Sequence, residues 1–369
     1  MNYLHKKTVL VTGCCGTVGS ELVRQLLEKY SVGELIGLDN NESELFFMEQ
    51  RYLKHNKAQF FLADVRDRDK LARKFKGVDI VFHAAAFKHV ILCERSPFEA
   101  VQTNILGIRN VIDAACECNV KRLIFTSSDK AVNPTNVMGT SKLMGERLIT
   151  AANSTLRGKG PVFASTRFGN VLGSRGSVIP IFREQIRKGG PVTLTDPKMT
   201  RFIMSIKEAT RLVIDSAYFA RGGEVFVTKM PVIRIKDLAE VMIQELAPKY
   251  RQKPQNIKII NIGAKAGEKL YEELMSEEET RRTFELELYF TVLPAFQCMY
   301  RDIQYEYPNI ISRNVTNPYN SANETPLSHG QLRDFLINNE LLEESPELMD
   351  HPAERYWPGN ETGDKSCIS

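Results

Sequence analysis

A glycine-rich turn near the start of the chain constrains the fold most. The apolar run Thr8–Val11 leads into Thr12-Gly13-Cys14-Cys15-Gly16-Thr17-Val18-Gly19, and an amphipathic helical pattern follows from 19 to 29. Glycine has no Cβ, so the backbone can turn tightly here and approach a pyrophosphate at a helix N-terminus. A strand, this turn and a helix, in that order, are what a dinucleotide-binding unit requires. The segment therefore predicts a Rossmann-like fold.

Strand and helix patterns alternate along the first half of the chain. Short apolar runs typical of strands lie at 35–38, 60–62, 78–82, 123–125 and 163–167, with helical patterns between them. This alternation predicts an α/β fold, a doubly wound parallel sheet with helices on both faces. After Val171 the rhythm breaks into glycine-rich loops and shorter elements. We therefore expect an NAD-binding Rossmann domain at 1–171, a smaller α/β substrate-binding region at 172–282, and a C-terminal extension and tail at 283–369.

The end of the second predicted strand bears on the choice of cofactor. Asp39 lies there, 20 residues after Gly19. A carboxylate at this place can accept hydrogen bonds from the adenosine ribose and repels a 2′-phosphate. Asn40 and the two residues after it supply no arginine to neutralise such a phosphate, which favours NAD over NADP unless a distant arginine is recruited. Further cofactor contacts are expected at Asp64, Val65, Ala84, Ala85 and Ala86.

Composition excludes several classes of protein. Of the 369 residues 43% are hydrophobic and 25% charged, which supports a sizeable core and argues against disorder. The net charge of +4 is small and dispersed, so small anionic ligands are a better expectation than nucleic acid. No apolar run approaches the roughly 18 residues that span a bilayer, and no signal peptide precedes the first strand, so we expect a cytoplasmic protein without membrane insertion. Seven cysteines have neither disulfide nor zinc-site spacing, and no metal is expected.

A second informative segment is Ser128-Asp129-Lys130, which follows the fifth predicted strand. An acidic and a basic group side by side can act as the acid and base of an elimination, provided that the carboxyl is partly desolvated. Met138 and Lys142 are four residues apart, so a helix would place them on one face. Methionine has no proton to give, which indicates an oxidoreductase-type site rebuilt for another reaction. A surface ion pair and a core methionine are the structural alternatives.

Longer motifs resemble a known family. The glycine-rich turn, the alanines at 84–86, Asn104, and Ser128 with Lys142 resemble the extended short-chain dehydrogenase/reductases. The nearer resemblance is to the nucleotide-sugar 4,6-dehydratases of polysaccharide and glycan biosynthesis, and within them to UDP-N-acetylglucosamine 4,6-dehydratases. It rests on AFKHV at 86–90, SSDKA at 127–131, NPTNVMG at 133–139 and RFGNVLGSRGSV at 167–178. The similarity extends from Thr8 to about Glu279.

The resemblance implies a reaction. In this family, NAD takes a hydride from carbon 4 of a UDP-hexose, water is eliminated across carbons 5 and 6, and the hydride returns to carbon 6. By resemblance, Lys130 is the base at carbon 5 and Asp129 the acid at carbon 6. Ser128 bonds the oxygen on carbon 4, Lys142 holds the nicotinamide ribose, and Asn104 is a further cofactor contact. Whether an ordered water or Asp129 relays the carbon 4 hydroxyl proton stays open. The Met138-type branch is associated with retention at carbon 5, and thus with the xylo product.

Substrate contacts are expected mainly after the sixth predicted strand, where donors suited to a diphosphate gather. The resemblance also implies a homodimer or higher homo-oligomer, because family members commonly pair through a four-helix bundle. Two alternatives remain: a nucleotide-sugar 4-epimerase, which would need an acid/base at the Met138 position, and a non-catalytic NAD-binding regulatory protein. The candidate UDP-sugar contacts are Lys88, His89, Asn170, Ser174, Arg175, Ser177, Val178, Arg201 and Glu268.

Overall fold

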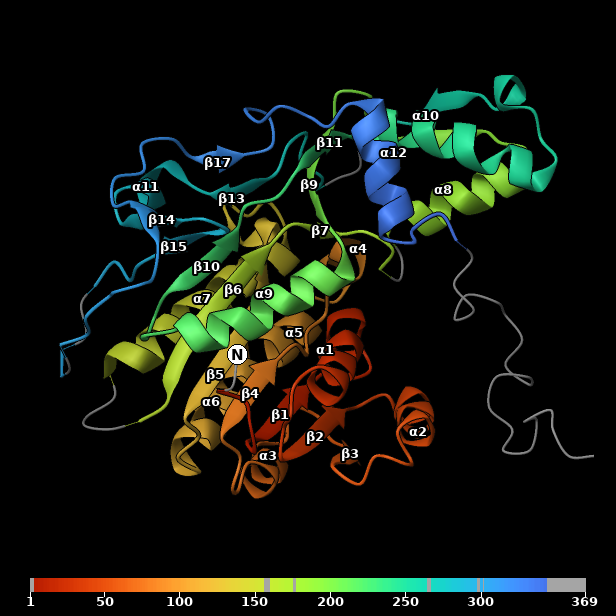
Figure 1. Ribbon diagram of the computed structural model, residues 1–369. Coiled ribbons are helices and arrows are strands. Elements are labelled where there is room, and N and C mark those ends of the chain that lie inside the picture. Colours follow the sequence, from red (N-terminus) through yellow and green to blue (C-terminus); the bar gives the residue numbers. More distant parts are fainter. Residues whose placement is uncertain are drawn as a thin grey trace, which may run out of the picture.

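The structure is a computed structural model that describes residues 3–155, 160–174, 177–263, 267–296, 299–300 and 302–343. A ten-stranded sheet lies at its centre, in the order β16-β14-β15-β10-β6-β5-β4-β1-β2-β3 (Figure 1). Its strands are β1 Thr8–Thr12, β2 Glu34–Asp39, β3 Ala58–Leu62, β4 Ile80–His83, β5 Arg122–Ser128, β6 Val162–Phe168, β10 Val225–Thr228, β14 Thr283–Leu286, β15 Tyr289–Val292 and β16 Ile310–Ser312.

Neighbouring strands in the run β10-β6-β5-β4-β1-β2-β3 are paired in parallel. This run forms the Rossmann-like part of the sheet, which confirms the predicted fold class. The sequences of β1, β4 and β5 are nearly continuous apolar runs because helices cover both of their faces. The antiparallel strands β15, β14 and β16 extend this sheet beyond the predicted parallel core. Strand β10 belongs to the expected region 172–282, and β14 to β16 belong to the expected region 283–369. Strands from all three expected regions therefore share one sheet, and the division at 171 and 282 stays a prediction.

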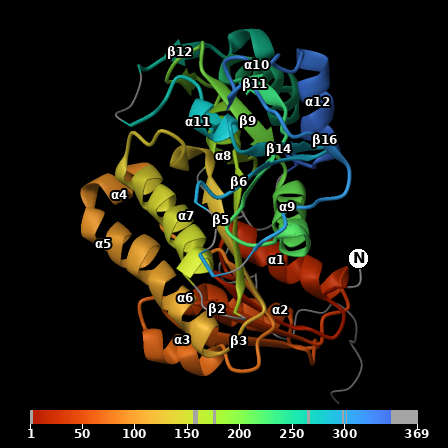
Figure 2. The same cartoon turned by 90° about the vertical axis from the view of Figure 1, so that its left-hand side faces the viewer.

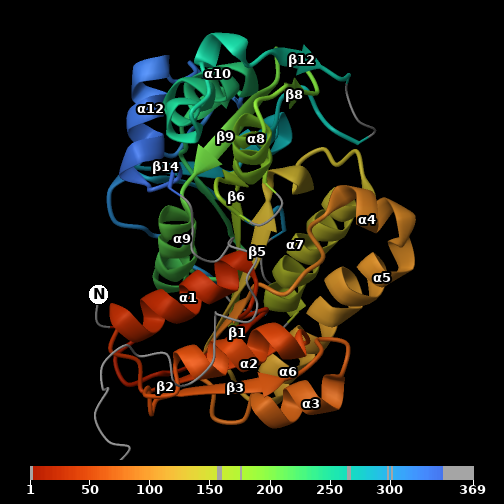
Figure 3. The same cartoon turned by 90° about the vertical axis from the view of Figure 1, so that its right-hand side faces the viewer.

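Helices form a layer on each face of the sheet, and Figures 2 and 3 show the two layers on opposite sides. One layer contains α1 Thr17–Glu28, α2 Glu42–Arg51 and α9 Ile206–Phe219. The other contains α3 Arg68–Lys74, α6 Gly107–Glu117 and α7 Val137–Thr155. Within the ranges given above, every helix is too short or too polar to span a bilayer.

A second, smaller hydrophobic core lies apart from the helices that flank the sheet, and Figure 1 shows its helices together. It includes residues of the small parallel strand pair β8 and β12. Its elements are α8 Val178–Arg187, β8 Val192–Leu194, α10 Ile235–Leu246, β12 Ile259–Asn261 and α12 His329–Asn338.

Short elements connect the two cores and bring distant segments to the end of β5. Strands β11, β9 and β7 form a three-stranded sheet, and β13 pairs with β17. The contact between β13 and the 3-10 turn η2 places the segment before β13 next to the residues that follow β5. The bounds are α4 Val90–Arg95, α5 Pro97–Val101, η1 Gln102–Leu106, η2 Asp129–Ala131, β7 Asn170–Val171, β9 Thr200–Met204, β11 Val232–Arg234, β13 Glu273–Met275, α11 Glu277–Thr280 and β17 Tyr319–Asn320.

Candidate active site

The glycine-rich turn between β1 and α1 has a geometry that only glycine allows. Gly13 has a φ of +68°, and a Cβ built there would lie 2.6 Å from the backbone nitrogen of Ala85. A Cβ at Gly19 would lie 1.9 Å from the carbonyl oxygen of Gly13, so α1 begins in close contact with the turn. The helix starts at Thr17, directly after Gly16. Its unpaired N–H groups therefore lie at the carboxyl end of β1, where a pyrophosphate can bind.

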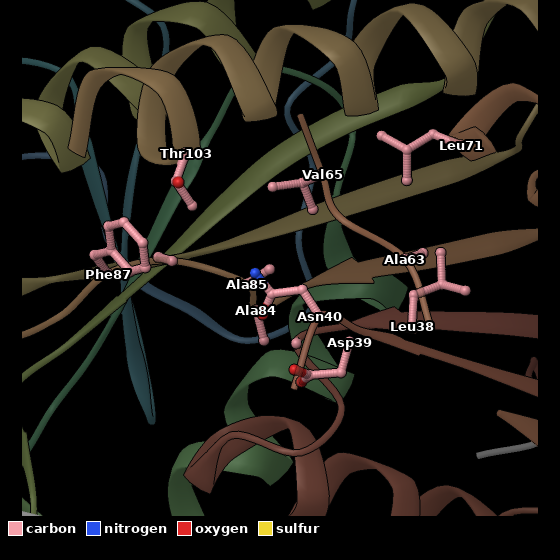
Figure 4. Close-up of a pocket in the computed structure, with 12 residues that line it drawn as sticks. Leu38, Asp39, Asn40, Ala63, Val65, Leu71, Ala84, Ala85, Phe87 and Thr103 are labelled. Atoms are coloured by element: carbon pink, nitrogen blue, oxygen red, sulfur yellow. The ribbon is translucent and has the colours of Figure 1, made fainter. Parts of the chain in front are cut away.

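A cavity of about 130 Å³ lies beside this turn (Figure 4). Asp39 is held at its edge because its carboxylate accepts the N–H groups of Cys15 (2.9 Å) and Asn41 (3.0 Å). The predicted residues that line the cavity are Gly13, Asp39, Asn40, Val65, Ala84, Ala85 and Ala86. Leu38, Ala63, Leu71, Phe87 and Thr103 also line it and were not predicted.

Of the other predicted cofactor residues, Thr17, Val18 and Lys142 line a second, larger cavity, whereas Asp64 and Asn104 line neither. Asp64 is paired with Arg66 (Nη2 to Oδ2, 2.7 Å), and the hydrogen bonds from that guanidinium lower the pKa of Asp64. Asn104, which is buried in η1, donates to the carbonyl of Phe87 (3.0 Å) and to Ser141 Oγ (2.9 Å), and its Oδ1 accepts the Phe87 N–H (2.8 Å). Asn104 thus fixes the loop after β4 against α7, and its direct contact with a cofactor stays a prediction.

A larger cavity of about 880 Å³ is lined by residues of the dinucleotide turn and by the segments that follow β4, β5 and β6. Its volume lies within the range of pockets that enclose small-molecule ligands. Arg175 lies outside the described residues. Every other predicted catalytic or substrate residue lines this cavity, namely Lys88, His89, Ser128, Asp129, Lys130, Met138, Lys142, Asn170, Ser174, Ser177, Val178, Arg201 and Glu268.

Asp129 and Lys130 form an ion pair in η2, in which Asp129 is buried and Lys130 is partly exposed. Asp129 is only 1% exposed, which excludes the alternative of a surface ion pair. Its Oδ1 accepts hydrogen bonds from Ser128 Oγ (2.6 Å), from the Lys130 N–H (2.9 Å) and from Lys130 Nζ (3.1 Å). Its Oδ2 is buried and has no hydrogen-bond partner among the described residues. One oxygen of Asp129 is therefore fixed by the chain and the other is left for a ligand.

Glu272, directly before β13, is a functional candidate that sequence reasoning missed. Its Oε1 lies 3.5 Å from Lys130 Nζ and 3.8 Å from Arg201 Nε. Burial, and then the charge of Asp129, raise the pKa of the Glu272 carboxyl. Burial opposes the charge on Lys130, but Asp129 and Glu272 outweigh it, and the pKa of Lys130 is raised. A single glutamate in an irregular segment carries no local motif, so only the tertiary contact reveals it.

Arg201 lines the cavity, but its hydrogen bonds go to the backbone. Its guanidinium donates to the carbonyls of Thr200 (2.7 Å), Lys269 (2.8 Å) and Leu270 (3.3 Å). These bonds hold the segment before Glu272 against β9, so Arg201 has a structural role in addition to the predicted substrate contact.

Ser177 directly precedes α8. Within the described chain its buried Oγ has no hydrogen-bond partner, so this hydroxyl is suited to donate to a phosphate.

Met138 and Lys142 lie on α7, and both line the cavity as their spacing predicts. Lys142 Nζ donates to the carbonyl of Thr126 (2.9 Å), and burial lowers the pKa of Lys142 to about 8. Met138 is buried against Cys93 and Ala100. It therefore belongs to the core and to the cavity wall at the same time.

Comparison with known proteins identifies the family. Residues 9–294 match the family described as polysaccharide biosynthesis protein. The chain belongs to this family, and the glycine-rich turn together with the parallel sheet order places it among the extended short-chain dehydrogenase/reductases.

Several relatives and one solved structure are similar over most of the chain. An uncharacterized membrane protein from Methanocaldococcus jannaschii is 54% identical over 79% of this chain and 87% of that protein. The UDP-N-acetylglucosamine 4,6-dehydratase (inverting) of Campylobacter jejuni is 38% identical over 81% and 86%. A UDP-glucose 4-epimerase of Rickettsia bellii is 36% identical over 92% and 97%. The X-ray structure of Pen from Bacillus thuringiensis has a TM-score of 0.84 and 40% identity, covering 92% of this chain and 100% of that one.

Proposed function

We propose that this protein is an NAD-dependent nucleotide-sugar 4,6-dehydratase whose substrate is UDP-N-acetylglucosamine. The observation that carries the proposal is the ion pair between the buried Asp129 and Lys130, 3.1 Å apart, in a cavity that is also lined by residues of the dinucleotide turn. The 38% identity to a UDP-N-acetylglucosamine 4,6-dehydratase supports the same reaction.

The residues around the smaller cavity fit NAD. Gly13 lets the backbone approach a pyrophosphate, and Asp39 presents a carboxylate to the adenosine ribose at the end of β2. NAD held here would supply the acceptor for the hydride on carbon 4 of the sugar and the donor of the hydride to carbon 6. Lys142 holds the nicotinamide ribose. Release of the nucleotide from the native protein and chromatography should yield NAD, and recovery of NADP would contradict the argument from Asp39.

The chain's own residues move the protons. Ser128 Oγ bonds the oxygen on carbon 4, and Asp129, through the free Oδ2, accepts the hydroxyl proton from that oxygen. The ketone formed at carbon 4 acidifies the proton on carbon 5, which Lys130 removes. The electron pair of the broken C–H bond forms a double bond between carbons 5 and 6. Asp129 delivers its proton to the carbon 6 hydroxyl, which leaves as water, so the acid and base that elimination needs are adjacent.

Mass spectrometry after incubation with UDP-N-acetylglucosamine and NAD, without added reductant, tests this function. A product lighter by one water is expected. The identity to a UDP-glucose 4-epimerase favours a second candidate, which would give an isomer of unchanged mass. Against it, Met138 lacks the proton that a 4-epimerase needs at this position. A non-catalytic NAD-binding protein would give no product, and absence of water loss with several UDP-sugars would contradict the dehydratase.

We further propose a cytoplasmic location and a homo-oligomer, as the sequence and the family resemblance suggest. Large apolar side chains are exposed along α4, α5 and η1, namely Leu92 (60%), Phe98 (82%) and Leu106 (46%), which supports a face covered by a second copy of the chain. Light scattering on the purified protein should give the mass of a dimer or higher oligomer. The monomer mass would contradict this part of the proposal.

A further inference from the structure

Three ionisable side chains meet at the end of β5. Lys130 Nζ lies 3.1 Å from Asp129 Oδ1 and 3.5 Å from Glu272 Oε1. Both carboxyls are buried, with Asp129 1% and Glu272 3% exposed. Each has one oxygen, Asp129 Oδ2 and Glu272 Oε2, that is buried without a hydrogen-bond partner in the described ranges. All three residues line the larger cavity, so the group is one cluster that faces the substrate.

The proposed dehydration places two demands on this cluster. Lys130 must be a neutral amine, because an ammonium has no lone pair to accept the carbon 5 proton. Asp129 must begin as a carboxylate, because it takes up the carbon 4 hydroxyl proton. A lysine between two carboxylates normally keeps its proton at neutral pH. The reactive form therefore needs another place within the cluster for that proton.

We propose that Glu272 takes up this proton when the reactive form of the cluster is made. The proton moves from Lys130 Nζ to Glu272 Oε1, which leaves an amine on Lys130 and a neutral carboxylic acid on Glu272. No atom is gained or lost, the net charge of the cluster is unchanged, and Asp129 stays ionised. The inference rests on the proposed dehydratase function. Glu272 acts through Lys130 and is a positioning residue, because it need not touch the reacting carbons.

The charges around Glu272 come from three directions. Asp129 and Lys130 face it from η2, Arg201 from β9, and Lys269 from the preceding segment. Burial and Asp129 raise the pKa of Glu272, the three cations lower it, and the result is a raised pKa. At 3.8 Å, Arg201 Nε is too far to hydrogen-bond Oε1, so Arg201 contributes charge without satisfying the carboxyl. The pKa of Lys130 is raised as well, so the ion pair is the resting form, and the proton is on Glu272 only in the reactive form.

The backbone holds Glu272 in place independently of the cluster. Its N–H donates to Ser321 Oγ (2.9 Å), and its carbonyl accepts the N–H of Ser321 (2.8 Å). Ser321 Oγ also shares a hydrogen bond with Thr200 Oγ1 (2.9 Å). These contacts follow from the pairing of β13 with β17 and do not use the side chain. A change of the carboxyl to an amide should therefore leave the fold intact.

Glu272→Gln tests the proposal because an amide cannot accept the proton. At pH 7, turnover of UDP-N-acetylglucosamine should fall by about 10²-fold. It should then rise about tenfold per pH unit toward the pKa of a lysine, as Lys130 loses its proton to solvent. The wild type should show a plateau near neutrality. Glu278→Gln, at an exposed glutamate of α11 that pairs with Arg282, is the matched control and should keep the wild-type profile.

Two results would overturn the proposal: a Glu272→Gln variant with the wild-type profile, or one whose low turnover does not recover at high pH. Bound nucleotide and Tm, measured on the same preparations, show whether the variant is folded. If Glu272→Gln does not fold, Glu272→Asp is the second test, because it keeps a proton acceptor. Its turnover should be lower than that of the wild type but should show the same plateau near neutrality. A rise in turnover toward the pKa of a lysine would contradict the proposal.

Infrared spectroscopy gives a readout apart from turnover. As the wild type is titrated from neutral toward acid pH, the band of a buried carboxylic acid should appear at a higher pH than for an ordinary glutamate, and it should be absent from Glu272→Gln, even if no UDP-sugar loses water.

Discussion

At the scale of single residues, burial determines what the charged groups of the cavity can do. An exposed Asp–Lys pair contributes little to stability, because water and salt screen the two charges. Asp129, in contrast, is 1% exposed and has one oxygen bound by Ser128 and Lys130 while the other is free. A carboxyl in this position can take up and deliver a proton within the cavity, which is the task that the elimination requires.

Lys130→Ala and Asp129→Asn should each lower the rate of dehydration by about 10²–10⁴-fold, the usual contribution of one positioned acid or base. Both variants should keep bound NAD, because neither side chain lines the smaller cavity beside the dinucleotide turn. Turnover by mass spectrometry and nucleotide content by absorbance check the two halves of the prediction. Near-normal turnover in either variant would remove that residue from the mechanism.

Replacing Lys142 should lower the activity of the protein and raise its stability. Burial lowers its pKa to about 8 from 10.5, so the unfolded chain binds more protons between these values and stability rises with pH across that window. At pH 7 the buried charge costs roughly 3 kcal/mol. Lys142→Met should therefore lose turnover yet raise the free energy of unfolding at pH 7 by about 1–3 kcal/mol, with a smaller gain at pH 9.5. Urea denaturation at both pH values measures this, and a destabilised variant would show that the bond to Thr126 matters more than the buried charge.

At the scale of elements, one buried arginine joins its own strand to three other elements. Arg167 on β6 lies 2.6 Å from Glu146 of α7 and 2.9 Å from Glu279 of α11, and it donates to the carbonyl of Leu274 in β13 (2.8 Å). Burial raises the pKa of Glu279, but the charge and hydrogen bonds of Arg167 outweigh it and lower the pKa to about 2. The segment that contains Glu272 is thereby anchored to the parallel sheet.

Arg167→Met should destabilise the protein by about 3–5 kcal/mol at pH 7, because it leaves two buried carboxylates without a partner. The stability that Glu279 contributes is present above pH 4.5 and is lost as pH falls from 4.5 to about 2. The difference in free energy of unfolding between the wild type and Arg167→Met should therefore become smaller in acid. Urea midpoints at pH 7 and pH 4 test this. Arg187→Met, at an exposed ion pair on α8, should change the stability by less than about 1 kcal/mol. Equal effects of the two substitutions would refute the argument.

The elements show which features a sequence can reveal. The turn from Gly13 to Gly19, and Met138 with Lys142, were predictable because local spacing fixes their geometry. The strands β14, β15 and β16 were not predicted, since short strands at the edge of a sheet carry weak patterns and depend on their partners. Glu272 could not be predicted either. It reaches Lys130 only because β13 contacts η2, and no spacing rule encodes that contact.

At the scale of the whole molecule, the larger cavity lies between the parallel sheet and the second hydrophobic core. Thr17 and Lys142 line the cavity from α1 and α7, which cover the sheet. Phe182 and Ile235 line it from the second core. The sequence indicates which residues have suitable chemistry on each side. It does not show how the two cores are placed, because that depends on long-range contacts such as the pairing of β9 with β11, two strands that contribute side chains to both cores. The stereochemical course of the reaction depends on how the two sides of the cavity are placed, because this decides which proton donors surround the sugar.

The product should retain its configuration at carbon 5. Inversion needs a second acid on the face opposite the base, and Met138, at the position where another branch of the family has tyrosine, has no proton to supply. Lys130 can instead return the proton that it removed, which gives the xylo 4-keto product. Proton couplings, followed by NMR from the first minutes in deuterated buffer, distinguish the two outcomes. The Campylobacter jejuni relative is described as inverting, so it is the natural reference enzyme. An initial arabino product would show that another group provides the second proton and that Met138 serves only to pack α7.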